Sequence, residues 1–355
     1  MLGLITMNSF TAESPFFERQ ITWLALSVGV FFVASIIDWR FLRRTGVVVA
    51  LYIFVCGLLA ALFVTGSVFK GAQSWFNLGF AAFQPVDLAK VVLIILLAKY
   101  FSRRHVEIAN IRHILVSGAY AFAIFGLVAV QPDFGSAVIL FLLWFGMVFV
   151  SGISRKHLLA VVTLGGVVFL GLWFFGFEEY QKARIQTFLN PLADIHGSGY
   201  NAYQSTIAVG SGGLTGKGIG YGTQSKLRFL PEYQTDFIFA AFAEEWGFLG
   251  VLMLIALFAF LVFRILTYGS RGATNFETLF SLGVAILFMS HFVIHVGINV
   301  GLLPVTGTTL PFMSYGGSHL VAEFLALGMV VGMRRYARET SRDAYGKEVS
   351  HGYDR

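Results

Sequence analysis

The sequence predicts an all-α polytopic membrane protein, and three observations lead to this fold class. Charged residues make up 12% of the 355 residues, whereas soluble domains carry about 25%. Hydrophobic residues make up 57%, and apolar runs recur from one end of the chain to the other. Most of these runs are near or above the roughly 20 residues that a helix needs to cross about 30 Å of hydrocarbon. We therefore expect a single transmembrane domain over residues 1–355.

About nine transmembrane helices are expected. Two of the apolar runs, 86–101 and 137–152, are short. The run 236–267 would reach about 48 Å as one unbroken helix, so we expect it to protrude, tilt or break near Gly247 and Gly250. The nine runs are 21–37, 46–66, 86–101, 112–130, 137–152, 157–176, 236–267, 276–297 and 318–334.

Basic residues gather in every second loop, and this pattern predicts the orientation, because lysine and arginine concentrate in cytoplasmic loops. The short charged tail 340–355 is then cytoplasmic, and the large loop 178–235 is outside the cell. Nine spans with a cytoplasmic C-terminus place the N-terminus outside, so the chain begins as if one helix were missing. The net charge of +6 comes from brief, scattered segments, so we expect no nucleic-acid partner.

The loop 178–235 is the only extramembrane segment large enough for a structured site. Loops longer than about 15 residues are usually functional or disordered, and the aromatic residues of this loop argue against disorder because they give it something to bury. The stretch GSGGLTGKGIGYG at 210–222 lacks a glycine and the Ser or Thr of a P-loop, so no nucleotide is expected. Its N–H groups and Lys217 are nevertheless suited to cradle a phosphate.

Asp236, at the start of the run 236–267, is the candidate catalytic residue. It is either a helix cap, a common role for aspartate, or a functional carboxylate at a site mouth. Intramembrane carboxylates cost roughly 3 kcal/mol and normally have a functional or pairing reason. Glu244 lies about 80° round the helix and about 12 Å along it, and Glu245 points nearly opposite Asp236. The three carboxylates are therefore not expected to form one cluster.

Asp87 and Lys90 are spaced i, i+3 and share one helix face at the outer start of a span. Two interpretations are open for them: a mutually neutralising pair, or a polar ledge that faces a cavity. Asp133, in the turn QPDFGS, is assigned to turn chemistry.

The stretch 299–318 is rich in glycine and contains two prolines. We expect an irregular loop, which membranes tolerate only where protein or a water-filled cavity surrounds it. His291 and His295 share a helix face nearby and are predicted to be packed polar residues, not metal ligands.

Five stretches together resemble one family. They are FQPVDLAK, QPDFGS, RIQTFLNPLAD, GSGGLTGKGIGYGTQSKLRFLPEYQTDFIFAAFAEEWGFLG and GLLPVTGTTLPFMSYGGS. In this order they are similar to the SEDS family of shape, elongation, division and sporulation proteins, over nearly the whole chain. The forms GTQSKLRFLPE and AFAEEWG look more like RodA, the elongation member, than FtsW, the division member. The family's first helix is nearly absent, since LGLITMNSFTA matches only its outer end.

The resemblance implies a ten-helix peptidoglycan glycosyltransferase of the bacterial cytoplasmic membrane. Such an enzyme polymerises lipid II on the outer face, beside a class B penicillin-binding protein and among membrane lipids. Asp236 matches the family's catalytic acid in TDFIF and would be the general base for the acceptor hydroxyl. Asp87 and Lys90 match a functional acid and lysine of the family, although Asp87 is one methylene shorter than the usual glutamate.

The leaving pyrophosphate needs a positive charge beside it. Four basic residues of the outer loop are candidates, and a divalent cation, Mg²⁺ or Mn²⁺, is the alternative. The candidates are Arg184, Lys217, Lys226 and Arg228.

Two other functions stay open at this point. One is a transporter that flips lipid II, which would need a charged path and inverted repeats; Glu244, Glu245 and Glu323 favour it. The other is a non-catalytic scaffold that recruits a cell-wall synthase.

Overall fold

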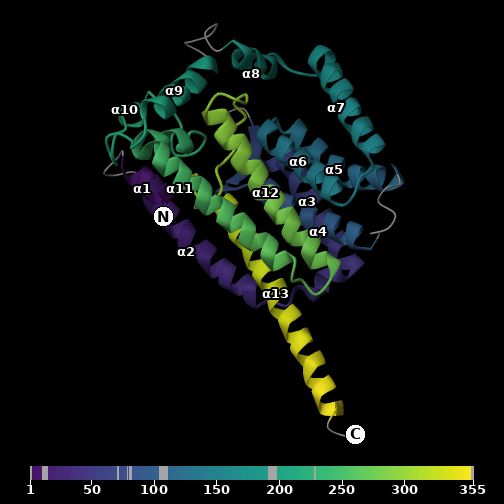
Figure 1. The fold of residues 1–355 in the computed structure, drawn as a ribbon. Helices are drawn as coiled ribbons and strands as arrows, with labels where there is room; N and C mark the ends of the chain where they lie inside the picture. Colours follow the sequence, from purple (N-terminus) through teal and green to yellow (C-terminus); the bar gives the residue numbers. More distant parts are fainter. Residues whose placement is uncertain are drawn as a thin grey trace. The chain divides into compact units, whose positions relative to one another are not determined.

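The computed structural model describes residues 2–9, 15–69, 72–77, 79, 82–103, 111–190, 198–227 and 229–352. Within these ranges the chain is almost entirely helical, as the sequence predicts (Figure 1). Every one of the nine predicted spans is a helix. In the described residues, six helices are long and apolar enough to cross a membrane, and a seventh apolar helix, Phe134–Val150, is shorter.

The helices begin and end close to the predicted limits, with two exceptions. The first spanning helix begins earlier, at Pro15, and the last continues to Gly352, through most of the segment predicted as a tail. The bounds are α2 (Pro15–Ile36), α3 (Thr45–Thr65), α4 (Pro85–Ser102), α5 (Ile111–Val130), α6 (Phe134–Val150), α7 (Arg155–Phe175), α11 (Ile238–Gly269), α12 (Asn275–Asn299) and α13 (Gly317–Gly352).

The chain divides into two compact units, each assembled from three separate segments. Unit 1 consists of Met1–Thr22, Ile153–Ala259 and Met289–Gly316. Unit 2 consists of Trp23–Gly152, Phe260–Phe288 and Gly317–Arg355.

Unit 1 contains the outer loop predicted at 178–235. The loop is structured, as its aromatic content suggests, and forms α8 (Glu179–Leu189), α9 (Ser198–Ser211) and α10 (Thr223–Lys226). The N-terminal helix α1 (Leu2–Asn8) places Met7 in a buried apolar cluster with residues of α11 and of the loop 300–316. This packing holds the start of α11 and the loop against each other.

The helix α11 breaks at Gly247, as expected from its length. Gly247 has φ 64° and ψ −168°, a conformation that only glycine adopts readily. A Cβ there would lie 2.2 Å from the backbone nitrogen of Gly216. The glycine-rich segment 212–218 therefore packs backbone to backbone against the break, and Phe248 N donates to Gly213 O at 2.9 Å.

In unit 2 the helix α4 is buried along most of its length and packs against α3, α5, α6 and α13. A small antiparallel sheet, of order β1-β2-β3, precedes it. Its strands are β1 (Ser67–Phe69), β2 (Ala72–Asn77) and β3 (Ala82–Phe83). The sheet could not be predicted from the sequence, because its strands of two to six residues are too short to show an alternation of apolar and polar residues.

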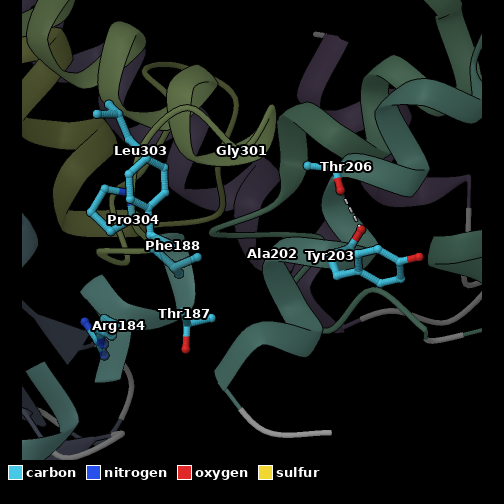
Figure 2. A pocket seen from close by; sticks show the side chains of 10 residues that line it. Arg184, Thr187, Phe188, Ala202, Tyr203, Thr206, Gly301, Leu303 and Pro304 are labelled. Carbon is cyan, nitrogen blue, oxygen red and sulfur yellow. Dashed lines mark hydrogen bonds between the residues drawn. The ribbon is translucent and has the colours of Figure 1, made fainter. Parts of the chain in front are cut away.

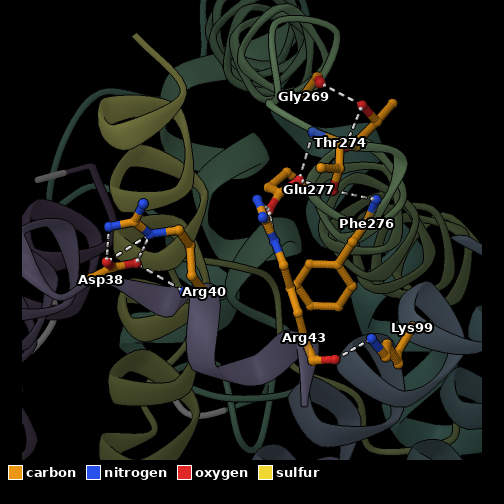
Figure 3. A network of polar contacts seen from close by, with 9 residues as sticks. Asp38, Arg40, Arg43, Lys99, Gly269, Thr274, Phe276 and Glu277 are labelled. Atoms are coloured by element: carbon orange, nitrogen blue, oxygen red, sulfur yellow. Dashed lines mark hydrogen bonds and ion pairs between the residues drawn. The ribbon is translucent and has the colours of Figure 1, made fainter. Parts of the chain in front are cut away.

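A network of polar contacts joins three helix ends of unit 2 (Figure 3). Arg43 Nη2 lies 2.5 Å from Oε1 of the buried Glu277, and Lys99 donates to the carbonyl of Arg43. Beside them Arg40 bonds to Asp38 and holds the pKa of that exposed carboxyl below its usual value. Arg43 and Lys99, which the sequence assigns to the same membrane face, thus lie together in unit 2.

Candidate functional site

Asp236 is half-buried in unit 1, two residues before α11 begins at Ile238. Side chains from other elements hold its backbone. Ser314 Oγ donates to the carbonyl of Thr235 at 2.8 Å, and Asn299 Nδ2 donates to the carbonyl of Asp236 at 3.0 Å. The loop 300–316 and the end of α12 therefore fix the backbone from which the Asp236 side chain projects.

Asn299 is a key support that sequence reasoning missed. It is fully buried, and besides Asp236 O its Nδ2 donates to His295 O, while its Oδ1 accepts from Ala240 N at 3.0 Å. The last bond satisfies one of the N–H groups that every helix start leaves without an intrahelical partner. The available signal was an amide at the end of an apolar run, because buried amides are normally bonded.

The loop 300–316 is irregular, as predicted, and is tied to α12 by two histidines. His295 Nδ1 lies 2.8 Å from Thr308 O, and His291 Nδ1 lies 3.2 Å from the next carbonyl. Both rings are buried, which confirms the prediction of packed polar residues. Just before these ties, Gly307 has φ +71°, and a Cβ there would lie 3.8 Å from Asp236 Oδ2. The loop backbone therefore runs directly beside the Asp236 carboxylate.

A cavity of about 360 Å³ lies in unit 1, beside the same loop. Figure 2 shows its lining side chains, most of them apolar, with the polar Arg184 and Thr187 on α8 and Tyr203 and Thr206 on α9. Val305 belongs to this lining and is two residues from Gly307, so their Cα atoms are at most about 7 Å apart. The lining is Arg184, Thr187, Phe188, Ala202, Tyr203, Thr206, Gly301, Leu303, Pro304 and Val305.

Several N–H groups of the glycine-rich segment are already bonded within the protein. Lys217 N and Gly218 N donate to backbone carbonyls of α11 at 3.0 Å, and Thr223 N donates to the buried Glu244 carboxylate. These N–H groups hold the broken helix, and the phosphate cradle stays a prediction for the rest of the segment. Lys217 Nζ itself lies 2.7 Å from Glu244 Oε1.

The remaining basic candidates that the structure describes, Arg184 and Lys226, lie on different helices, α8 and α10. Arg184 lines the cavity. Lys226 is exposed at the end of α10. Arg228 lies outside the described residues.

Asp87 and Lys90 form the expected pair in unit 2, with Nζ 3.1 Å from Oδ1 and both side chains about 3% exposed. The pair belongs to a larger network that the sequence did not reveal. Ser318 Oγ donates to Asp87 Oδ2 at 3.2 Å, and His319 Nδ1 lies 3.2 Å from Asp87 Oδ1. Because Ser318 and His319 are more than 200 positions away from Asp87, no local pattern connects them.

Asp133 has the turn role that the sequence predicts. It is the N-cap of α6, since Oδ1 accepts from Ser136 N at 3.0 Å. Its Oδ2 accepts from Gln84 Nε2 at 3.1 Å.

Comparisons with known proteins agree with this architecture. The FtsW/RodA/SpoVE family model, described as "Cell cycle protein", matches residues 3–339. The chain is 36% identical to the peptidoglycan glycosyltransferase MrdB of Escherichia coli (strain K12), over 96% of this chain and 91% of that protein. It is 33% identical to the stage V sporulation protein E of Bacillus subtilis (strain 168), over 95% and 94%.

Two solved structures share the fold. A chain from a study of structural coordination of polymerization and crosslinking by a peptidoglycan synthase complex has a TM-score of 0.80 and 31% identity, covering 94% of each chain. The rod shape determining protein RodA of Thermus thermophilus has a TM-score of 0.70 and 30% identity, covering 94% of this chain and 92% of that one. The protein described here therefore belongs to the SEDS (FtsW/RodA/SpoVE) family.

Proposed function

We propose that this protein is a peptidoglycan glycosyltransferase that polymerises lipid II on the outer face of the cytoplasmic membrane during cell elongation. The observation that carries the proposal is the placement of Asp236. Its backbone is fixed by Asn299 and Ser314. Its carboxylate lies beside Gly307, which has no side chain. A substrate hydroxyl can approach a carboxylate across a glycine without meeting a side chain. The names of MrdB and of the FtsW relatives support the same activity.

The proposed reaction transfers the growing glycan to an incoming lipid II. The acceptor 4-hydroxyl attacks the anomeric carbon of the glycan, and the bond from that carbon to undecaprenyl pyrophosphate breaks with its electron pair on the pyrophosphate. Asp236 takes the hydroxyl proton as the new bond forms. The released pyrophosphate gains negative charge, which a cationic group nearby stabilises.

We assign the cavity of Figure 2 to the lipid-linked pyrophosphate. Its lining is mostly apolar, which suits isoprene units, and Arg184 brings a permanent positive charge that suits phosphate. Val305 of its lining is two residues from Gly307, which lies beside Asp236. Lys217, Lys226 and Arg228 remain further candidates.

A divalent cation is not assigned to this site. Among the described residues there is no group of three or more His, Cys, Asp or Glu side chains suited to hold a metal ion. We propose that basic side chains compensate the charge of the leaving pyrophosphate, with a divalent cation, Mg²⁺ or Mn²⁺, as the alternative.

The cavity assignment predicts that Arg184→Gln raises the KM for lipid II several-fold, because a charged partner of the pyrophosphate is lost. The matched control is Lys182→Gln on the same helix, since Lys182 pairs with Glu179 and does not line the cavity. Initial rates of polymerisation at several lipid II concentrations provide the measurement. Equal KM values for the two variants would remove Arg184 from the site.

The C-terminus is placed in the cytoplasm under this proposal, and the partner is a class B penicillin-binding protein. The clustering of basic helix ends around Arg43 and Glu277 supports one shared face. The complex in which a related chain was solved couples polymerization to crosslinking, which supports a crosslinking partner here.

The transporter alternative loses its main support in the structure. Each of the three glutamates that favoured it has a structural partner: Glu244 contacts Lys217, Glu245 accepts from Gly220 N, and Glu323 contacts His319. The deciding experiment gives purified lipid II to the purified chain, with and without its partner, in detergent and in liposomes. Glycan strands in detergent establish the polymerase. Transfer of lipid II between leaflets without any glycan would establish the transporter, and neither activity would favour the scaffold.

A further inference from the structure

His319 of α13 lies between two buried carboxylates in unit 2. Its Nδ1 is 3.2 Å from Asp87 Oδ1, and its Nε2 is 3.0 Å from Glu323 Oε1. Both carboxylates are at most 4% exposed. Neither His319 nor Glu323 has a part in the proposed reaction, so the burial of this histidine and this glutamate needs a separate explanation.

With both carboxylates ionised, the charges around His319 balance if the ring carries a proton on both nitrogens. Asp87 and Glu323 contribute two negative charges, and Lys90 contributes one positive charge. A neutral imidazole carries a single N–H, whereas the imidazolium carries one on the nitrogen nearest each carboxylate and brings the sum to zero. Buried charge without compensation is costly. Asp133 lies one step further away, joined through Gln84.

The same contacts fix the orientation of Asp87 from outside its own helix. Oδ1 faces Lys90 and His319, and Oδ2 accepts from Ser318. Asp87 is one methylene shorter than the glutamate usual in the family. A short side chain at the start of α4 thus meets two residues at the start of α13, which reach toward it and hold both of its oxygens.

We propose that His319, held as an imidazolium by Glu323, is a positioning residue that orients Asp87 and balances the charge of the buried Asp87–Lys90–Glu323 cluster for substrate binding. This inference rests on the proposed function and on the family resemblance, which gives the buried Asp87 and Lys90 a functional role. His319 acts through Asp87 and does not itself touch the substrate.

The test uses the full chain with its class B partner and purified lipid II. The variants are His319→Gln, His319→Ala and the double variant Asp87→Glu/His319→Ala. The matched control is His113→Gln, because His113 is a buried histidine of the same unit whose Nδ1 bonds to the Tyr100 hydroxyl, a neutral group. Initial rates are measured against lipid II concentration and against pH, together with the monodisperse fraction of each preparation.

We expect both single variants to lower kcat/KM by up to about 10²-fold, the effect of misplacing a positioned group by about 1 Å. The monodisperse fraction should not change. The unsubstituted protein should lose activity as the pH rises, because loss of the ring proton leaves excess buried negative charge, and His319→Gln should lack this alkaline decline. The double variant should recover part of the rate, since the longer glutamate extends into the space left by the ring. His113→Gln should match the unsubstituted protein.

Two results would overturn the inference. One is a His319→Gln protein with unchanged rate and unchanged pH profile. The other is a loss of rate with the alkaline decline intact and no recovery in the double variant, which would indicate packing alone. Asp87→Asn and Lys90→Met test the underlying assumption separately. If both polymerise normally, the substrate-binding role of the pair fails, and the inference fails with it, while the activity of the chain stands.

Discussion

At the scale of single residues, the candidate site depends on a glycine that the sequence did not single out. Gly307 has φ +71°, and its missing side chain leaves the space beside Asp236 Oδ2 open. Asn299 and Ser314, far away in the sequence, fix the backbone on which that carboxylate sits. The acid itself was predictable from its motif, but these supports were not, because tertiary contacts leave no local pattern.

Gly307→Ala should therefore lower the kcat of polymerisation by up to about 10²-fold, since a methyl group beside the carboxylate displaces the acceptor hydroxyl. It should also lower the free energy of unfolding by about 1–2 kcal/mol, the cost of a left-handed conformation for alanine. Gly79→Ala is the control, because Gly79 has φ +82° and nothing within 4 Å of its added Cβ. Both variants should lose stability, and only Gly307→Ala should lose rate. An equal loss of rate in both would attribute the effect to backbone strain.

At the scale of elements, the sequence predicted the spanning helices because apolar runs of about 20 residues match the length that crosses a membrane. The break in α11 was also predictable, from a run too long for one span and from its glycines. The segment that packs against the break was not predicted: the stretch 210–222 was interpreted as a phosphate cradle, yet Lys217 N and Gly218 N donate to carbonyls of α11. A glycine-rich pattern reports close backbone approach, and the sequence does not say whether a ligand or another helix approaches.

Gly247→Ala should abolish folding, because the added Cβ would overlap the backbone of Gly216 at 2.2 Å and the conformation is essentially restricted to glycine. The monodisperse yield after detergent extraction and the Tm of any remaining protein measure this. Gly57→Ala is the control. Gly57 lies inside α3 with nothing within 4 Å of its added Cβ, so alanine should be neutral or stabilise by up to about 1 kcal/mol. A Gly247→Ala protein with an unchanged Tm would show that the break in α11 is not required.

At the scale of the whole molecule, we propose that this member of the SEDS family polymerises lipid II with Asp236 as the base. From the sequence, the class of reaction could be predicted. The sequence could not separate a base from a helix cap, because both roles call for an aspartate just before a helix. The structure places Asp236 two residues before α11, where a capping role and a catalytic role are compatible, so the separation needs a measurement.

Asp236→Asn makes that separation. Asparagine caps helices about as well as aspartate, so folding, monodispersity and binding to the class B partner should be unchanged. Asparagine does not accept the hydroxyl proton, and loss of a general base typically lowers a rate by about 10²–10⁴-fold. The measurement is glycan polymerisation from purified lipid II by the monodisperse, partner-bound Asp236→Asn protein beside the unsubstituted protein. We predict a loss of that size with the complex intact. Near-normal polymerisation would contradict the account and leave helix capping as the role of Asp236.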